Sequence, residues 1–199
     1  MQKETEKIDV WLRSNLKYTD LKETIERALK FYGQNYEKML IESDLILLLN
    51  DKRQRNTLGR FNSLEMQITL FRVRESLEKN ILDCVFVHEM AHFIDNFNRR
   101  ANSRYNYASS QPGTKERIIA ELFRMKMEPV LKKRTNYRGR TCELFARAIE
   151  EFYAISTKNE GWKERFLEND YYVNEFIFRR EIYSVIAGYI KELKNNPFP

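Results

Sequence analysis

One stretch decides how this chain is organised: Val87-His88-Glu89-Met90-Ala91-His92-Phe93-Ile94-Asp95. It contains the only two histidines of the 199 residues, and they stand four positions apart. On an α-helix, positions i and i+4 lie on the same face, one turn apart. Two imidazoles at this spacing can share one metal ion. Glu89 is turned about 100° away, so it can act on a metal-bound water more easily than it can bind the metal.

This His-Glu-x-x-His spacing is typical of zinc hydrolases, in which the glutamate is the general base. We therefore expect His88 and His92 to bind one Zn²⁺ and Glu89 to be catalytic. The alternative is a core helix whose histidines only make hydrogen bonds. A catalytic zinc site has three protein ligands and one open position, so the rest of the chain has to supply a third ligand.

Length and composition predict one domain over residues 1–199. Apolar residues make up 42% of the chain, and only six glycines and four prolines interrupt it, which favours long helices. Two cysteines, Cys84 and Cys142, do not make a disulfide framework. With no signal peptide and no apolar run long enough for a membrane span, we expect a cytoplasmic protein without a membrane partner.

The formal net charge is +6, from 35 basic and 29 acidic residues. A basic surface is compatible with a nucleic-acid partner. The charges are mostly interspersed, however, and no nucleic-acid-binding motif is present. An ordinary solvated surface is therefore the favoured interpretation, and nucleic-acid binding remains an alternative.

Apolar periodicity predicts an α+β fold, mostly helical, with a small sheet of about three strands packed on a central helix. The central helix is expected over residues 77–98, since its middle is apolar nearly all round. Cys84 lies one turn before His88 and is expected in the core rather than on the metal. The other expected helices are 3–16, 20–36, 114–127, ended by Pro129, 142–157, capped by Thr141, a short helix near 162–167, and 171–193.

The strands are expected at 43–50, as a buried strand, and at 58–61 and 65–74, as a hairpin. Residues 99–113 are expected to form a surface loop beside the metal motif. In the second arm of the hairpin, apolar and polar residues alternate, which we interpret as an exposed edge strand. An extended peptide could add to this edge by main-chain hydrogen bonds. The residues expected to bind substrate are Met66, Gln67, Ile68, Thr69 and Leu70.

The third ligand has to be a carboxylate or a thiolate, because no third histidine exists. Two downstream helices offer a glutamate in a similar frame, Ala120-Glu121-Leu122-Phe123-Arg124 and Cys142-Glu143-Leu144-Phe145-Ala146. Glu143 is favoured, because Ala146 lies one turn on along its face and allows close helix approach. Glu121 is followed on its face by bulky side chains, and it remains the alternative.

The segment Tyr137-Arg-Gly-Arg-Thr-Cys-Glu143-Leu-Phe-Ala-Arg-Ala-Ile-Glu-Glu-Phe-Tyr153 resembles the second motif of gluzincin-type zinc metallopeptidases. It is most similar to the zincin domains of phages and conjugative elements, and more distantly to the catalytic domain of anthrax lethal factor. Glu143, Phe145 and Ala146 match the family pattern, whereas Ile149 replaces the usual phenylalanine. The resemblance covers residues 43–157 and implies a zincin-like fold.

The resemblance also implies roles for single residues. Glu143 would be the third zinc ligand, and Tyr137 would donate a hydrogen bond to the oxyanion. Asp95 follows His92 by three, as an acidic residue does in the lethal-factor-like pattern, and could orient a histidine from behind. The expected function is zinc-dependent hydrolysis of a protein or peptide substrate. Alternatives are a zinc-binding module of a mobile element without turnover, a nucleic-acid-associated protein and a small-molecule amidohydrolase.

Overall fold

The computed structural model describes residues 19–33, 45–50, 58–71, 78–99, 106–131, 140–159 and 180–195. Within these ranges the protein is mostly helical with one small mixed sheet, as an α+β fold was predicted to be. The elements, in chain order, are α2 (Thr19–Tyr32), β1 (Ile46–Asn50), β2 (Gly59–Asn62), β3 (Gln67–Phe71), α4 (Glu78–Phe97), the 3₁₀ turn η1 (Ala108–Ser110), α5 (Lys115–Leu131), α6 (Thr141–Thr157) and α8 (Arg180–Asn195).

Strands β2 and β3 form the predicted hairpin, pairing antiparallel with Gly59 opposite Leu70. The side chain of Asn62 accepts a hydrogen bond from the backbone N–H of Leu64 at 3.1 Å, which starts the turn. Met66 ends the turn in a left-handed conformation, with φ of 47°. Strand β1 then pairs parallel with β3 on its other side.

The strand order is therefore β1-β3-β2, and the prediction that residues 66–70 form an exposed edge strand is wrong. The alternation along β3 correctly reported its two faces, since Ile68 and Leu70 are buried and Gln67 and Thr69 are half-buried. Alternation of apolar and polar residues along a strand shows which face of the strand meets the core. It does not show which strands pair on its two sides, because that depends on other segments of the chain. The prediction of a buried strand at 43–50 also needs correction, because Ile46 and Leu48 are each 41% exposed.

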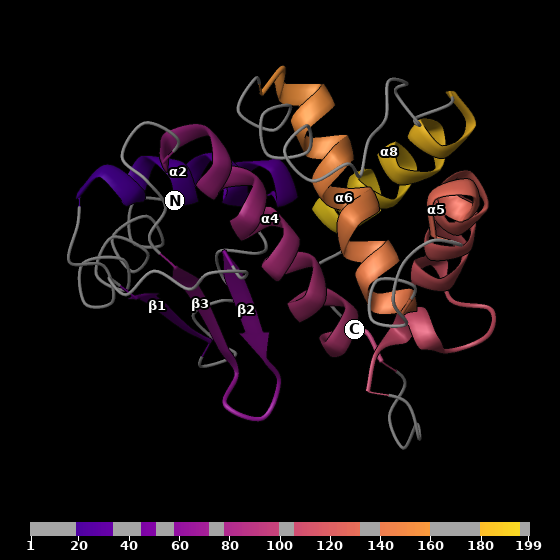
Figure 1. Ribbon diagram of the computed structural model, residues 1–199, viewed down its shortest axis with the longest axis horizontal. Helices are drawn as coiled ribbons and strands as arrows, with labels where there is room; N and C mark the ends of the chain where they lie inside the picture. Colours follow the sequence, from indigo (N-terminus) through magenta and orange to yellow (C-terminus); the bar gives the residue numbers. More distant parts are fainter. Residues whose placement is uncertain are drawn as a thin grey trace.

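Helix α4 is the centre of the molecule (Figure 1). It contacts β2 and β3 on one side and α6 on the other, with α2 against its N-terminal half. Helices α5 and α8 lie beyond α6, away from the sheet. All residues from 81 to 96 are buried, as expected for a helix that is apolar nearly all round.

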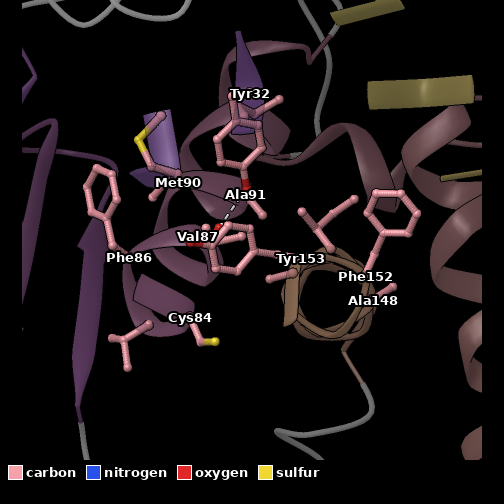
Figure 2. Close-up of a cluster of buried hydrophobic side chains, with 14 of the residues drawn as sticks. Tyr32, Cys84, Phe86, Val87, Met90, Ala91, Ala148, Phe152 and Tyr153 are labelled. Atoms are coloured by element: carbon pink, nitrogen blue, oxygen red, sulfur yellow. Dashed lines mark hydrogen bonds between the residues drawn. The ribbon is translucent and has the colours of Figure 1, made fainter. Parts of the chain in front are cut away.

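Apolar side chains of α4 pack into the main core (Figure 2). Tyr32 of α2 donates a hydrogen bond of 2.7 Å from its hydroxyl to the carbonyl of Val87. Phe86 and Met90 are fully buried in the same cluster. Cys84 is also 0% exposed within this cluster, which confirms its assignment to the core. Burial of each large apolar side chain contributes about 1.5–3 kcal/mol, so this packing holds the metal motif on a rigid helix.

The C-terminus of α5 and the N-terminus of α6 differ from the sequence-based expectation. Helix α5 continues through Pro129 to Leu131, so the proline lies in the last turn and does not end the helix before it. Thr114 caps α5, accepting a hydrogen bond from the N–H of Arg117 at 3.2 Å. Thr141 does not cap α6, because it is itself the first helical residue and its hydroxyl lies 3.0 Å from that of Ser110.

Helix α2 ends at Tyr32, with Gly33 in a left-handed conformation at φ of 101°. The N–H of Gly33 donates to the carbonyl of Leu29 at 2.9 Å, as in a glycine C-cap. The predicted helices at 3–16 and 162–167, the first part of the last helix and Tyr137 lie outside the described residues. No helix among the described residues is both long and apolar enough to cross a membrane.

Candidate metal centre

His88 and His92 lie side by side on one face of α4. Their ring centroids are 4.8 Å apart, and the rings are nearly perpendicular. Each residue is only 7% exposed. The helical spacing of four residues brings the rings together, and the burial of α4 removes them from bulk water. Burial of this kind would also be expected of core histidines that only make hydrogen bonds. The other side chains beside the two rings therefore decide between a metal site and a core helix.

Glu143 is the third member of the group, and it comes from the first turn of α6. Its Oε1 atom lies 3.3 Å from Nε2 of His92, and its Oε2 atom lies 3.8 Å from Nε2 of His88. Each of the three residues offers one ligand atom, and these atoms all lie within 4.8 Å of one another. The buried alanine one turn on, Ala146, is consistent with the close approach of α6 to α4. A buried His-His-Glu group of this geometry could bind a metal ion.

Glu121, the alternative ligand, lies elsewhere. It pairs with Arg117 at 2.5 Å and with Arg124 at 3.2 Å, and both of these arginines are on its own helix, α5. Its side chain is 37% exposed, compared with 7% for that of Glu143. The structure thus brings Glu143, and not Glu121, to the histidines.

The charges in the group are strongly coupled. Burial opposes ionisation of Glu143, but the hydrogen bond from His92 and the charges of His88, His92 and Arg147 hold the pKa of Glu143 well below its usual range. Burial by itself lowers the pKa of His92, yet the hydrogen bond and charge of Glu143, with Glu89 and Asp95 behind it, raise that pKa overall. A carboxylate that stays ionised beside two imidazoles also suits a cation, which would displace any proton held by the imidazoles.

Glu150 orients His88 from behind and was not recognised from the sequence. Its Oε2 atom accepts a hydrogen bond from Nδ1 of His88 at 2.9 Å, and the residue is 1% exposed. This contact leaves Nε2 of His88 as the nitrogen that faces Glu143, as an orienting carboxylate does in metal sites. Glu150 follows Glu143 by seven residues, and this two-turn spacing on one face of a helix is the signal that could have revealed it.

Asp95 does not take the role of orienting a histidine. Its carboxylate accepts two hydrogen bonds of 2.6 Å from Ser109, one from the backbone N–H and one from the hydroxyl. Burial raises the pKa of Asp95 to about 7 despite these two hydrogen bonds. Within the described ranges, Nδ1 of His92 is buried without a hydrogen-bond partner. Asp95 instead holds η1 against the end of α4.

Glu89 is 6% exposed and lies against strand β2. A Cβ atom at Gly59 would stand 2.8 Å from both Cγ and Oε1 of Glu89 and 2.6 Å from Cγ1 of Val85. These distances are shorter than real Cβ contacts, so a side chain at position 59 would force Val85, Glu89 or the strand itself to shift. The sequence did not single out Gly59. The glutamate of the metal motif is therefore in contact with a sheet edge.

The loop predicted at 99–113 does border the site, but it is not a surface loop throughout. Ala108, Ser109 and Gln111 are buried in and after η1. Tyr107 precedes η1, and its ring centroid lies 6.2 Å from that of His92. The predicted oxyanion donor, Tyr137, lies outside the described residues, and the predicted substrate residues 66–70 belong mainly to the central strand.

Comparison with known proteins gives no match: no family model, no curated protein and no solved structure is significantly similar to this chain. Functional inference therefore depends on the buried group of His88, His92 and Glu143 and on what surrounds it.

Proposed function

We propose that this protein is a zinc-dependent metallopeptidase with a zincin-like fold. The observation that carries the proposal is the convergence of His88, His92 and Glu143, with Glu89 buried on the same helix. Two imidazole nitrogens and one carboxylate are the protein ligand set of several catalytic zinc sites, in which water takes the fourth position. The buried Glu150 behind His88 supports a site built for a metal rather than an incidental cluster.

The proposed roles follow from this chemistry. When bound, zinc lowers the pKa of a water molecule toward neutrality and polarises the peptide carbonyl. Glu89 takes the proton of the attacking water and passes it to the leaving amine. His88 keeps its orientation through Glu150, so the ligand nitrogen is aimed before substrate arrives.

We further propose that the substrate peptide aligns with β2, and not with the residues 66–70 suggested by the sequence. β3 is occupied on both sides, by β1 and by β2, so its main chain has no free edge. β2 pairs with β3 on one side only within the described sheet, and Gly59 touches Glu89. A peptide added along β2 would therefore run past the general base.

The first experiment measures metal and cleavage in one protein. Purified wild type and Glu89→Gln are analysed by elemental mass spectrometry and then incubated with a peptide library, in which mass spectrometry detects new amine termini. Both proteins are expected to hold about one zinc per chain, and only wild type is expected to generate new termini. Zinc in both proteins without any new termini would instead support a metal-binding module without turnover. Zinc in neither would remove the enzyme hypothesis.

The close approach of β2 has its own test. Gly59→Ala is expected to retain zinc, because the three atoms nearest to the added Cβ belong to Val85 and Glu89 and not to a ligand residue. Turnover is expected to fall by at least about 10-fold, since the general base has to shift away from its position. The matched control is Gly188→Ala in α8, where an added Cβ meets nothing within 4 Å. Equal turnover of both variants would show that β2 does not set the position of Glu89.

A further inference from the structure

Tyr107 is held beside the metal centre by a segment that belongs to neither motif. Its ring is tilted by 59° to that of His92, with the centroids 6.2 Å apart. The residue is half-buried and directly precedes η1. It is thus the tyrosine that the described structure brings to the histidines, while the sequence resemblance pointed to Tyr137.

Tyr107 lies within electrostatic range of several ionisable groups of the site. The groups that act on it electrostatically are Cys142, Asp95, Glu143 and Glu89, in that order. A tyrosine hydroxyl ordinarily keeps its proton at neutral pH, so Tyr107 is a hydrogen-bond donor there. A donor beside His92 and within electrostatic range of Glu89 and Glu143 is well situated for a reacting carbonyl group.

The hydroxyl of Tyr107 is also available to donate a hydrogen bond to a ligand. The hydroxyls of Tyr32, Tyr153 and Tyr189 each donate a hydrogen bond within the protein. In the described part of the chain, the hydroxyl of Tyr107 makes no such bond. A half-buried donor that has no hydrogen-bond partner among the described residues can serve a ligand without first breaking a contact with them.

The segment around Tyr107 is fixed to both helices of the metal group. Asn96 of α4 donates a hydrogen bond of 2.6 Å to the carbonyl of Asn106, on one side of Tyr107. On the other side, Ser109 is held by Asp95 of α4, as described above, and Ser110 by Thr141 of α6 at 3.0 Å. The tyrosine is therefore positioned relative to the ligands before any substrate binds, which is the condition for effective oxyanion stabilisation.

We propose that Tyr107 is a catalytic residue whose hydroxyl donates a hydrogen bond to the oxyanion formed during peptide hydrolysis. This inference rests on the proposed function. As the water oxygen bonds to the carbonyl carbon, the π electrons move to the carbonyl oxygen, and Glu89 takes the water proton. Tyr107 stabilises the new negative charge and keeps its own proton. The C–N bond then breaks, and the amine leaves with the proton from Glu89.

The test uses zinc-loaded protein and two probes. A phosphonamidate dipeptide carries a tetrahedral, negatively charged phosphoryl group that mimics the oxyanion, whereas acetohydroxamate is planar and chelates the metal. Affinities are measured by isothermal titration calorimetry for wild type, Tyr107→Phe and Tyr137→Phe. The matched control is Tyr183→Phe, a substitution at an exposed position of α8.

Tyr107→Phe is expected to bind the phosphonamidate at least about 10-fold more weakly, with unchanged zinc content and unchanged acetohydroxamate affinity. Tyr183→Phe is expected to behave as wild type. Equal phosphonamidate affinity of Tyr107→Phe and wild type would overturn the assignment, as would a loss confined to Tyr137→Phe. A parallel loss of zinc or of acetohydroxamate would mean that Tyr107 only supports the site, which also overturns it. Wild type that binds neither zinc nor phosphonamidate would instead refute the proposed function itself.

Discussion

Helices α5 and α6 carry the same tripeptide and use it differently. Each contains Glu-Leu-Phe, with the glutamate at position 121 in α5 and at 143 in α6. In both, the phenylalanine is buried. Glu121 pairs with arginines of its own helix, while Glu143 is buried beside two histidines of α4. The difference arises because α6 packs directly on α4 and α5 packs on the far side of α6 (Figure 1).

The largest expected effect separates the two glutamates directly. Glu143→Ala removes one of three ligand candidates and is expected to lower zinc affinity by more than about 100-fold, because changes behind the ligands alone cost about 10–100-fold. Glu121→Ala removes a surface ion pair and is expected to leave zinc affinity unchanged. Competition with a chromogenic chelator measures both. Equal zinc affinity of the two variants would contradict the comparison.

A second difference between the two helices is the buried acid Glu151 of α6. Glu121 of α5, by contrast, forms ion pairs at the surface. Both carboxylate oxygens of Glu151 are buried without a hydrogen-bond partner in the described ranges. Burial, followed by the charge of Glu150, raises the pKa of Glu151 from 4.5 to about 8. Between pH 4.5 and 8, the unfolded chain ionises this carboxyl while the folded protein keeps it protonated. Stability is therefore expected to fall as the pH rises through that window.

Glu151→Gln is expected to remove this pH dependence. Relative to the variant, wild type loses at most about 1.4 kcal/mol of unfolding free energy per pH unit in the window. Urea unfolding at several pH values from 5 to 8 measures the difference, with Glu121→Gln as the surface control. Parallel curves for wild type and Glu151→Gln would show that this carboxyl is ionised in the folded protein.

An intermediate effect is expected at Glu150, next to Glu151 on α6. Glu150→Gln can still accept a hydrogen bond from His88 but loses the negative charge that supports a metal-bound imidazole. Zinc affinity is expected to fall by about 10-fold, the lower end of the range for groups behind metal ligands. Glu151→Gln serves again as the control, since the carboxylate oxygens of Glu151 make no hydrogen bond to either histidine. Unchanged zinc affinity of Glu150→Gln would mean that the charge behind His88 has no influence on the metal.

The smallest effects are expected from threonine substitutions at the N-terminal ends of α5 and α6. Thr114→Ala removes the cap of α5 and is expected to lower the unfolding free energy by about 1 kcal/mol. Thr141→Ala removes only the contact with Ser110 and is expected to cost about 0.5 kcal/mol, near the low end for one net hydrogen bond. Chemical denaturation at neutral pH measures both. A larger loss for Thr141→Ala would indicate that the link between α6 and η1 matters more than a helix cap.

Patterns local to one element were predicted well. The helix carrying the histidines was expected over 77–98 and is Glu78–Phe97, because its period and its near-continuous apolar character are properties of the segment itself. The β2–β3 hairpin was recognised for the same reason. Glu143 was also favoured from its local frame, and the structure brings it to the histidines.

The predictions that differ from the structure depended on contacts with segments distant in the sequence. β3 became the central strand because β1, some twenty residues earlier, pairs along its second side. Thr141 was expected to cap its helix, but Ser110 of a separate segment lies within hydrogen-bond distance of its hydroxyl. Asp95 was expected to orient a histidine, yet η1 folds back and Ser109 satisfies its carboxylate.

The sequence by itself determined the helical spacing of His88 and His92, the apolar helix that buries them and the mixed helix and strand content, because these follow from periodicity within one element. Only the tertiary structure decided that Glu143 rather than Glu121 meets the histidines, that Glu150 holds His88, and that Gly59 and Tyr107 border the site. The physical reason is that identical local patterns make different contacts, since side-chain partners are chosen by the packing of whole elements and not by neighbours in the chain.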